Sequence, residues 1–328
     1  MSLNENDVPV GRLAPSPTGA QHIGNARTFL LAWLSIRSRG GRLILRMEDI
    51  DSPRVKAGAA QQAIDDLRWL GLDWDYGPDC GGPDALYVQT ERVHLYRIAL
   101  AQLQAEERVY PCTCTRADVE AAASAPHVGQ EGPRYPGTCS HRSARDAASI
   151  HDRPYSWRLR TSDAPLSFDD IVHGRQMCSV RRELGDFVVG KVDGSPAYQL
   201  AVVVDDHEMG VTEVVRGDDL LPSTLRQLEL YEFFGWQSPQ FIHIPLVVGT
   251  DGRRLAKRHG DTRLSMLRER GVQPERLIGL LAWSCGLRDD SSPVSARELL
   301  ASFNWDALPQ TAFVFTDEML RVLTPECS

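Results

Sequence analysis

The sequence predicts an α/β fold with a parallel sheet, and three features near its start carry this prediction. An apolar run at residues 8–13 is typical of a strand, and the PSPTG loop at residues 15–19 excludes a helix there. Residues 26–36 form an apolar, helix-forming run, and residues 42–47 form a second strand-like run. Because right-handed crossovers join a strand, a helix and a strand, we expect the two strands to be parallel.

Periodicity and composition divide the rest of the chain. Helices are expected at residues 55–70, 90–107, 117–123, 220–234, 264–270, 275–285 and 295–303. Strands are expected at residues 156–159, 167–172, 176–180, 211–215 and 241–248, whereas residues 197–204 fit either a strand or a buried helix. We expect the α/β domain to occupy residues 1–108 and 191–260, with an insertion at 109–190 and a short helical region at 261–328.

Composition and charge limit the possible functions. A chain of 328 residues with 42% hydrophobic and 24% charged residues is typical of a globular protein of two or three domains. No apolar run reaches membrane-spanning length and the start is polar, so we expect a cytoplasmic protein with no membrane partner. The net charge of −8 argues mildly against a nucleic-acid partner, although residues 253–270 form a dense basic stretch.

The entrance to the first helix is the first candidate site. Backbone N–H groups point outward at a helix N-terminus, and the helix dipole favours negative charge there. Gly24 lets a ligand approach the backbone, and His22 can donate a hydrogen bond to a phosphate oxygen. Glu48 follows the second strand at the edge where α/β sheets bind ligands. The alternative for His22 and Gly24 is an ordinary turn before a helix.

The basic loop at residues 253–260, RRLAKRHG, is the second candidate site. The chain contains 33 arginines and only three lysines, so a lysine in this loop is notable. Lysine acts on phosphate as a compact point charge, whereas arginine acts as a planar fork. We therefore expect Lys257 to bind phosphate, and the alternative is a solvated surface loop.

Three cysteines, Cys112, Cys114 and Cys139, form the third candidate site. Seven cysteines in the whole chain are too few and too unevenly spaced for a disulfide scaffold. In a reducing compartment, three close thiolates suggest structural zinc, which needs four tetrahedral ligands. Three free thiols are the alternative.

These segments together resemble the class I aminoacyl-tRNA synthetases, in the glutamyl/glutaminyl branch. Residues 15–24, PSPTGAQHIG, are similar to the PSPTGxxHIG segment of that branch, and residues 254–258, RLAKR, are similar to its KMSKS motif. Asn25 replaces the last histidine of HIGH, while Arg254 and Ala256 replace the first lysine and the serine of KMSKS. The resemblance implies a Rossmann-like catalytic domain with a parallel sheet, a zinc-containing insertion and a short C-terminal helical region.

The resemblance implies roles for individual residues. ATP, with Mg²⁺, is bound by His22, Gly24, Asn25, Arg254 and Lys257. His22 and Lys257 are the catalytic residues, and Lys257 matches the lysine that stabilises charge on the leaving pyrophosphate. Members that modify queuosine carry a CxC…YxxxC zinc site, which here gives Cys112, Cys114, Tyr135 and Cys139. His141 is the alternative fourth ligand, because imidazole binds zinc more commonly than phenol does.

The resemblance also implies a glutamate pocket, formed by Arg12, Leu13, Ala14, Pro15, Ser16, Glu48, Tyr198 and Arg216. Glu48 can hold the substrate ammonium, while the two arginines and the Tyr198 hydroxyl can hold carboxylate oxygens. Arg216 favours glutamate, since a glutamine-specific site would not bury an unpaired guanidinium. From the residues alone, the alternative for Arg216 is a strand-end ion pair with Asp218 or Asp219.

The short stretch after the basic loop indicates which members of the branch are most similar. Only 71 residues follow Lys257 (328 − 257), whereas glutamyl-tRNA synthetases continue with a long anticodon-binding region. The resemblance is therefore closest to the truncated ligases, which activate L-glutamate with ATP and transfer it to the queuosine base in the anticodon of tRNA(Asp). We expect a monomer that contacts the anticodon arm. The alternatives are a short glutamyl-tRNA synthetase that charges the 3′ end of tRNA(Glu), and a non-catalytic nucleotide- or RNA-binding relative.

Overall fold

A four-stranded parallel sheet lies at the centre of the computed structural model, which describes residues 8–17, 20–50, 55–84, 86–122, 134–255 and 262–324. The strand order is β2-β1-β8-β9. These strands are β1 (Val10–Leu13), β2 (Arg42–Leu45), β8 (Glu213–Gly217) and β9 (Gln240–Ile244). The predicted parallel pairing of the first two strands is confirmed, with Val10 opposite Arg42.

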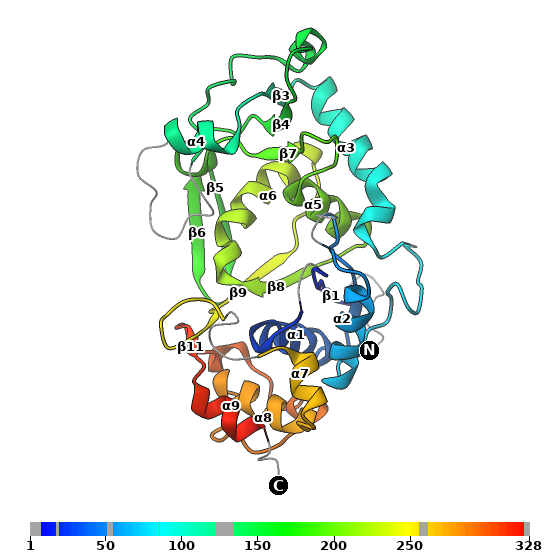
Figure 1. Ribbon diagram of the computed structural model, residues 1–328, viewed down its shortest axis with the longest axis vertical. Coiled ribbons are helices and arrows are strands. Elements are labelled where there is room, and N and C mark those ends of the chain that lie inside the picture. Colours follow the sequence, from blue (N-terminus) through cyan, green and yellow to red (C-terminus); the bar gives the residue numbers. More distant parts are fainter. Residues whose placement is uncertain are drawn as a thin grey trace.

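Helices cover both faces of this sheet (Figure 1). One hydrophobic core includes residues of α1 (Ile23–Arg37), α2 (Ala59–Trp69), α7 (Leu264–Glu269) and α8 (Pro274–Ser284). The other includes residues of α3 (Val93–Ala105), α5 (Tyr198–Glu208) and α6 (Leu221–Phe234). Neighbouring strand residues divide between the cores, as Val215 and Val214 do, because successive side chains of a strand point to opposite faces.

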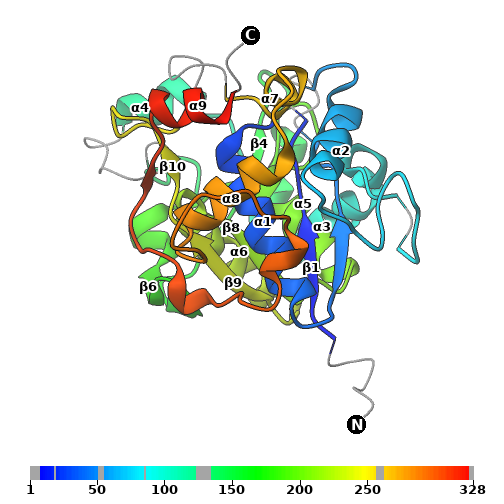
Figure 2. The same ribbon diagram turned by 90° about the horizontal axis from the view of Figure 1, so that it is seen from below.

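The C-terminal part of the chain packs on the α1 face. α8 lies against α1 when the molecule is seen from below (Figure 2). β10 (Val247–Val248) pairs in parallel with β11 (Phe313–Val314), and α9 (Asp317–Leu323) follows β11. Among the described residues, no helix combines the length and the apolar character that a membrane span requires.

The segment between α3 and α5 forms a separate, mostly antiparallel unit. β3 (Val109–Cys112), β4 (Ser156–Leu159) and β7 (Val188–Gly190) form a three-stranded sheet, and β5 (Pro165–Asp170) and β6 (Gly174–Ser179) form a hairpin. The unit also contains α4 (Arg116–Ala122), the 3-10 helix Ala144–Ser149 and the π-helix Val180–Leu184. The hairpin reaches back to the central sheet, where the Gln240 side chain of β9 donates to the Asp169 carbonyl at 2.7 Å.

Several elements differ from the sequence prediction. Of residues 197–204, all but the N-cap residue 197 belong to helix α5. Residues 200–206 are all buried, so their sequence shows no helical period of apolar and polar positions. The strand expected at 241–248 is interrupted at Pro245, which has no N–H to continue the ladder. The helix expected at 295–303 is wrong. Only Arg297–Leu299 form a 3-10 turn, and the buried residues Ala296, just before the turn, and Leu299, its last residue, are three positions apart. The helix expected at 90–107 begins as the 3-10 turn Gln89–Arg92.

Candidate active site

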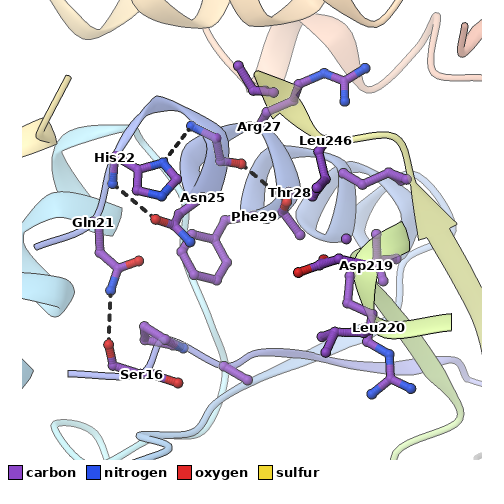
Figure 3. A pocket seen from close by; sticks show the side chains of 18 of the residues that line it. Ser16, Gln21, His22, Asn25, Arg27, Thr28, Phe29, Asp219, Leu220 and Leu246 are labelled. Atoms are coloured by element: carbon purple, nitrogen blue, oxygen red, sulfur yellow. Dashed lines mark hydrogen bonds between the residues drawn. The ribbon is translucent and has the colours of Figure 1, made fainter. Parts of the chain in front are cut away.

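A cavity of about 560 Å³ lies at the carboxyl ends of β1, β8 and β9, beside the start of α1 (Figure 3). This edge is where open α/β sheets bind ligands. The predicted residues that line it are Arg12, Ala14, Pro15, Ser16, His22, Gly24, Asn25, Glu48, Tyr198, Arg216 and Arg254. Leu13 is not among the lining residues: its side chain lies in the core, because neighbouring residues of β1 face opposite sides. Lys257 and Ala256 lie outside the described residues.

His22 begins helix α1 and is held in one orientation. Its backbone N–H donates to Asn25 Oδ1 at 3.1 Å, and its ring Nδ1 accepts from the Gly24 N–H at 3.1 Å. The ring proton of a neutral imidazole is therefore on Nε2. Burial, together with the charge of Arg254, lowers the pKa of His22 to about 4. At neutral pH the side chain is thus an uncharged donor.

Gly24 is required by the position of the His22 ring. A Cβ atom on Gly24 would lie 2.9 Å from Cε1 and 3.1 Å from Nδ1 of His22. The Thr28 hydroxyl donates to the Gly24 carbonyl at 3.2 Å, and the Gln21 side chain lies 3.5 Å from the Ser16 carbonyl, as Figure 3 shows. The first contact is internal to α1, and the second links Ser16 of the PSPTG loop to the residue before His22.

Glu48 and Arg12 lie at the inner end of the cavity over a buried ionic network. Arg46 donates to Glu48 at 2.9 Å and to Asp206 at 2.7 Å, and it is fully buried. Arg12 lies 3.9 Å from Asp206 and donates to the Val215 carbonyl at 3.1 Å. The network fixes one carboxylate and one guanidinium at the cavity wall. Arg46 directly follows β2 and Asp206 lies on α5, so nothing in the sequence indicates that they meet.

Arg216 is buried and is held by neutral acceptors. Its Nε lies 3.1 Å from Nε2 of His243, and its Nη2 donates to the Thr224 hydroxyl at 2.6 Å and to Gln227 Oε1 at 2.9 Å. Its Nη1 is buried and has no hydrogen-bond partner among the described residues. None of the described carboxylates lies within ion-pair distance of Arg216. A buried cation in this state favours an anionic ligand.

The strand-end ion pair that the sequence allowed for Arg216 is wrong. Asp219 lies 2.7 Å from Arg254 instead, and Asp218 lies 3.8 Å from His173. The contact between Asp219 and Arg254 joins the end of β8 to the basic loop across the cavity rim. Neighbours in sequence therefore do not neutralise Arg216.

Arg27 is a cavity residue that the sequence analysis missed. Its Nη1 donates to the Pro245 carbonyl at 2.6 Å, and its Nε donates to the Ser284 hydroxyl at 3.1 Å. It thereby joins α1 to α8 and to the link between β9 and β10. An arginine within an otherwise apolar helix is the signal that could have found it, because such a buried charge needs partners.

The cysteine group is compact enough to hold one metal ion. The sulfurs of Cys112, Cys114 and Cys139 lie within 4.8 Å of one another. The Tyr135 hydroxyl lies 3.3 Å from the Cys112 sulfur and 3.7 Å from the Cys114 sulfur, whereas His141 is exposed and outside the group. Burial raises the pKa of Cys139, but the Thr113 N–H and other hydrogen bonds outweigh it and lower this pKa to about 7. Three sulfurs and a phenol oxygen therefore fit a tetrahedral zinc ion.

Comparisons with known proteins all match one family of tRNA synthetases. Residues 9–322 match the sequence model of the catalytic domain of class I tRNA synthetases (E and Q). The chain is 50% identical to the glutamyl-Q tRNA(Asp) synthetase of Rhodopirellula baltica, over 94% of this chain and 97% of that one. It is 51% identical to the glutamyl-Q tRNA(Asp) synthetase of Symbiobacterium thermophilum, over 96% and 98% of the two chains.

A solved structure agrees with this result. The glutamate tRNA ligase of Elizabethkingia meningosepticum, in complex with its amino acid, superposes with a TM-score of 0.81 at 29% identity, over 97% of this chain and 69% of that one. The class I synthetase fold expected from the motifs is thus confirmed. The chain belongs to the class I tRNA synthetases of the glutamate and glutamine branch, within the family of the glutamyl-Q tRNA(Asp) synthetases.

Proposed function

We propose that this enzyme activates L-glutamate with MgATP and transfers the glutamyl group to the queuosine base in the anticodon of tRNA(Asp). The names of the relatives reported above support these substrates, since both are called glutamyl-Q tRNA(Asp) synthetases. The single observation that carries glutamate as the amino acid is Arg216, a buried cation at the cavity wall that none of the described carboxylates neutralises. A side-chain carboxylate is the group that such a site attracts most strongly.

The amino-acid half of the cavity is assigned by charge. Glu48 accepts from the substrate ammonium, while Arg216 and Arg12 donate to carboxylate oxygens. Burial raises the pKa of Tyr198 to about 12, so its hydroxyl is a neutral donor at physiological pH. Glutamine would offer Arg216 an amide without a charge, and this difference supports selectivity for glutamate.

The ATP half of the cavity is assigned to the start of α1. His22 donates from Nε2 to a phosphate oxygen, and Gly24 leaves room for both the ring and the ligand. Asn25 holds the His22 backbone in place. Arg254 lies at the rim, and Lys257, outside the described residues, is proposed to stabilise the leaving pyrophosphate.

The chemistry has two displacement steps. The α-carboxylate oxygen of glutamate attacks the α-phosphorus of ATP, the bond to the β-phosphate oxygen breaks, and pyrophosphate leaves. A queuosine hydroxyl then attacks the activated carbonyl carbon, loses its proton, and AMP leaves. No protein nucleophile is needed, so the enzyme acts by positioning and charge stabilisation.

We also propose structural zinc at Cys112, Cys114, Tyr135 and Cys139. The distances among these groups support Tyr135 over His141 as the fourth ligand. Zinc at this point would tie β3 to the loop around residue 139, in a unit that has little apolar core of its own. The enzyme is further proposed to be a cytoplasmic monomer that contacts the anticodon arm through residues 253–270.

The experiment that tests the proposal has two parts. ATP–pyrophosphate exchange should depend on glutamate, with glutamine and aspartate as poor substitutes. Labelled glutamate should then attach to tRNA(Asp) that contains queuosine, and not to the same tRNA with guanosine at that position. Removal of the 3′-terminal adenosine should leave the transfer intact. Preferred transfer to the 3′ end of tRNA(Glu) would contradict the proposed acceptor.

A further inference from the structure

A line of hydrogen bonds runs from the β5–β6 hairpin to the cavity. Asp170, the last residue of β5, lies 2.7 Å from Nδ1 of His243 through Oδ2 and also accepts the His243 backbone N–H at 2.9 Å. His243, on β9, in turn lies 3.1 Å from Nε of Arg216 through Nε2. All three side chains are buried. The hairpin therefore contacts the proposed carboxylate-binding arginine through one histidine.

The donors and acceptors along this line fix its proton arrangement. Arg216 has only N–H donors, so Nε2 of His243 must be the acceptor and the ring proton must be on Nδ1, directed at Asp170. Asp170 accepts further N–H bonds from Val172 at 3.0 Å and His173 at 2.9 Å. Burial raises the pKa of Asp170, but the hydrogen bond with His243 and the two backbone bonds outweigh it and lower this pKa, so the carboxylate stays ionised and accepts the Nδ1–H hydrogen bond.

The nearest negative charge on this line is the Asp170 carboxylate, and the His243 ring lies between it and Arg216. Its own partners are an imidazole, the Thr224 hydroxyl and the Gln227 amide oxygen, and all three are uncharged acceptors. A carboxylate in any of these places would form a buried ion pair with the guanidinium and weaken its attraction for a substrate carboxylate. Asp170 orients the histidine and touches Arg216 only through it.

We propose that Asp170 and His243 are positioning residues that set the selectivity for a substrate carboxylate. Asp170 holds His243 in the tautomer that accepts from Arg216, and the neutral acceptors orient the guanidinium while its charge stays available to the ligand. This inference rests on the proposed function, because it takes the ligand carboxylate to be that of glutamate.

Two matched substitutions of His243 separate positioning from general packing. In His243→Gln, the side-chain oxygen can reach the place of Nε2 and accept from Arg216. In His243→Asn, the shorter side chain can reach Asp170 but not Arg216. We expect the Asn variant to raise the KM for glutamate about tenfold or more in pyrophosphate exchange, with kcat and the KM for ATP within a few-fold, because one orienting bond to a charged group is lost. The Gln variant should stay within a few-fold of the wild type in all three constants.

A second substitution tests the charge and remains informative if both His243 variants fail to fold. Gln227→Glu keeps the shape but places a carboxylate 2.9 Å from Arg216, so it should raise the KM for glutamate about tenfold or more and reduce the preference over glutamine. Gln199→Glu is the control, since Gln199 accepts from Gln227 at 2.9 Å and does not itself contact Arg216. It should cause a clearly smaller change.

The outcomes distinguish this inference from the proposed function. A wild-type enzyme without glutamate-dependent exchange would overturn the proposed function and the inference together. If the wild type is active and folded Asn and Gln variants have equal glutamate KM values, the inference alone is overturned. An unchanged preference for glutamate over glutamine in Gln227→Glu would also overturn it.

Discussion

The guanidinium of Arg254 lies 2.7 Å from the carboxylate of Asp219, and this contact leaves Arg216 without the acidic neighbour that its sequence offers. Asp219 and Arg216 are only three residues apart, but β8 ends between them at Gly217. The acidic side chain therefore contacts the rim of the cavity, while the arginine stays inside it. This separation leads to the first prediction.

Arg216→Gln should abolish most glutamate activation. The variant keeps a polar side chain of moderate length but removes the cation, so the loss should be on the order of 100-fold in kcat/KM for glutamate and much smaller for glutamine. Steady-state pyrophosphate exchange with each amino acid measures both values. Equal losses for the two amino acids would contradict the proposed contact with a side-chain carboxylate.

Gly24→Ala should weaken ATP binding without a similar effect on glutamate. The added methyl group would lie 2.9 Å from Cε1 of His22, so the ring must move and its Nε2 donor moves with it. We expect the KM for ATP to rise about tenfold, as for the loss of one hydrogen bond to a charged group. The KM for glutamate serves as the internal control, and an unchanged KM for ATP would argue against phosphate binding by His22.

Lys257→Ala tests the basic loop through its proposed role in pyrophosphate release. Loss of a charge that acts in the transition state should lower kcat on the order of 100-fold, with little effect on glutamate binding. Lys56→Ala is a suitable control, because Lys56 is exposed and is another of the three lysines in the chain. Equal exchange rates for the two variants would indicate a solvated surface loop at Lys257.

The zinc site predicts about one zinc per chain by elemental analysis, as for a single structural site. Tyr135→Phe removes only the phenol oxygen and should speed zinc loss to a chelator. His141→Ala should lose zinc at the wild-type rate, because His141 is exposed and not part of the cysteine group. The opposite order of the two variants would identify His141 as the fourth ligand.

The buried His243 predicts a pH dependence of stability. Burial lowers its pKa to about 4, and the charge of Arg216 lowers it too, although the hydrogen bond to Asp170 raises it. Because this folded-state pKa is below the unfolded value of about 6.5, the contribution is complete above pH 6.5 and is lost as the pH falls toward 4.

The loss of stability as the pH falls can be measured. His243 should contribute a slope of up to about 1.4 kcal/mol per pH unit to the free energy of unfolding, and His243→Gln should remove it. Urea unfolding at several pH values between 4.5 and 6.5 compares the variant with the wild type, and His141→Gln is the control. A constant difference between His243→Gln and the wild type across this range would contradict a buried neutral histidine.

Much of the active site could be predicted from the sequence, because it lies in short contiguous segments. The PSPTG loop and His22 lie between a strand and a helix, and Gly24 is in the first turn of that helix, where backbone N–H groups favour an anion. Two of the three cysteines are also brought together by local chain, since β3 ends at Cys112 and Cys114 follows two residues later. Family motifs supplied Glu48, Tyr198 and Arg216, which single segments do not reveal.

Only the tertiary structure decided how those residues are held and charged. The wholly buried run at residues 200–206 lies in helix α5, which packs in the core against α3 and α6. Because the run is apolar on all sides, its sequence shows no period that would distinguish this helix from a buried strand. The Arg46 network joins the residue after β2 to α5, and the line from Asp170 to Arg216 joins a hairpin to two strands of the sheet. These partners are far apart in sequence and meet only after the chain has packed. Buried charged and polar groups depend on these tertiary contacts, because no water is available in the protein interior to pair with them.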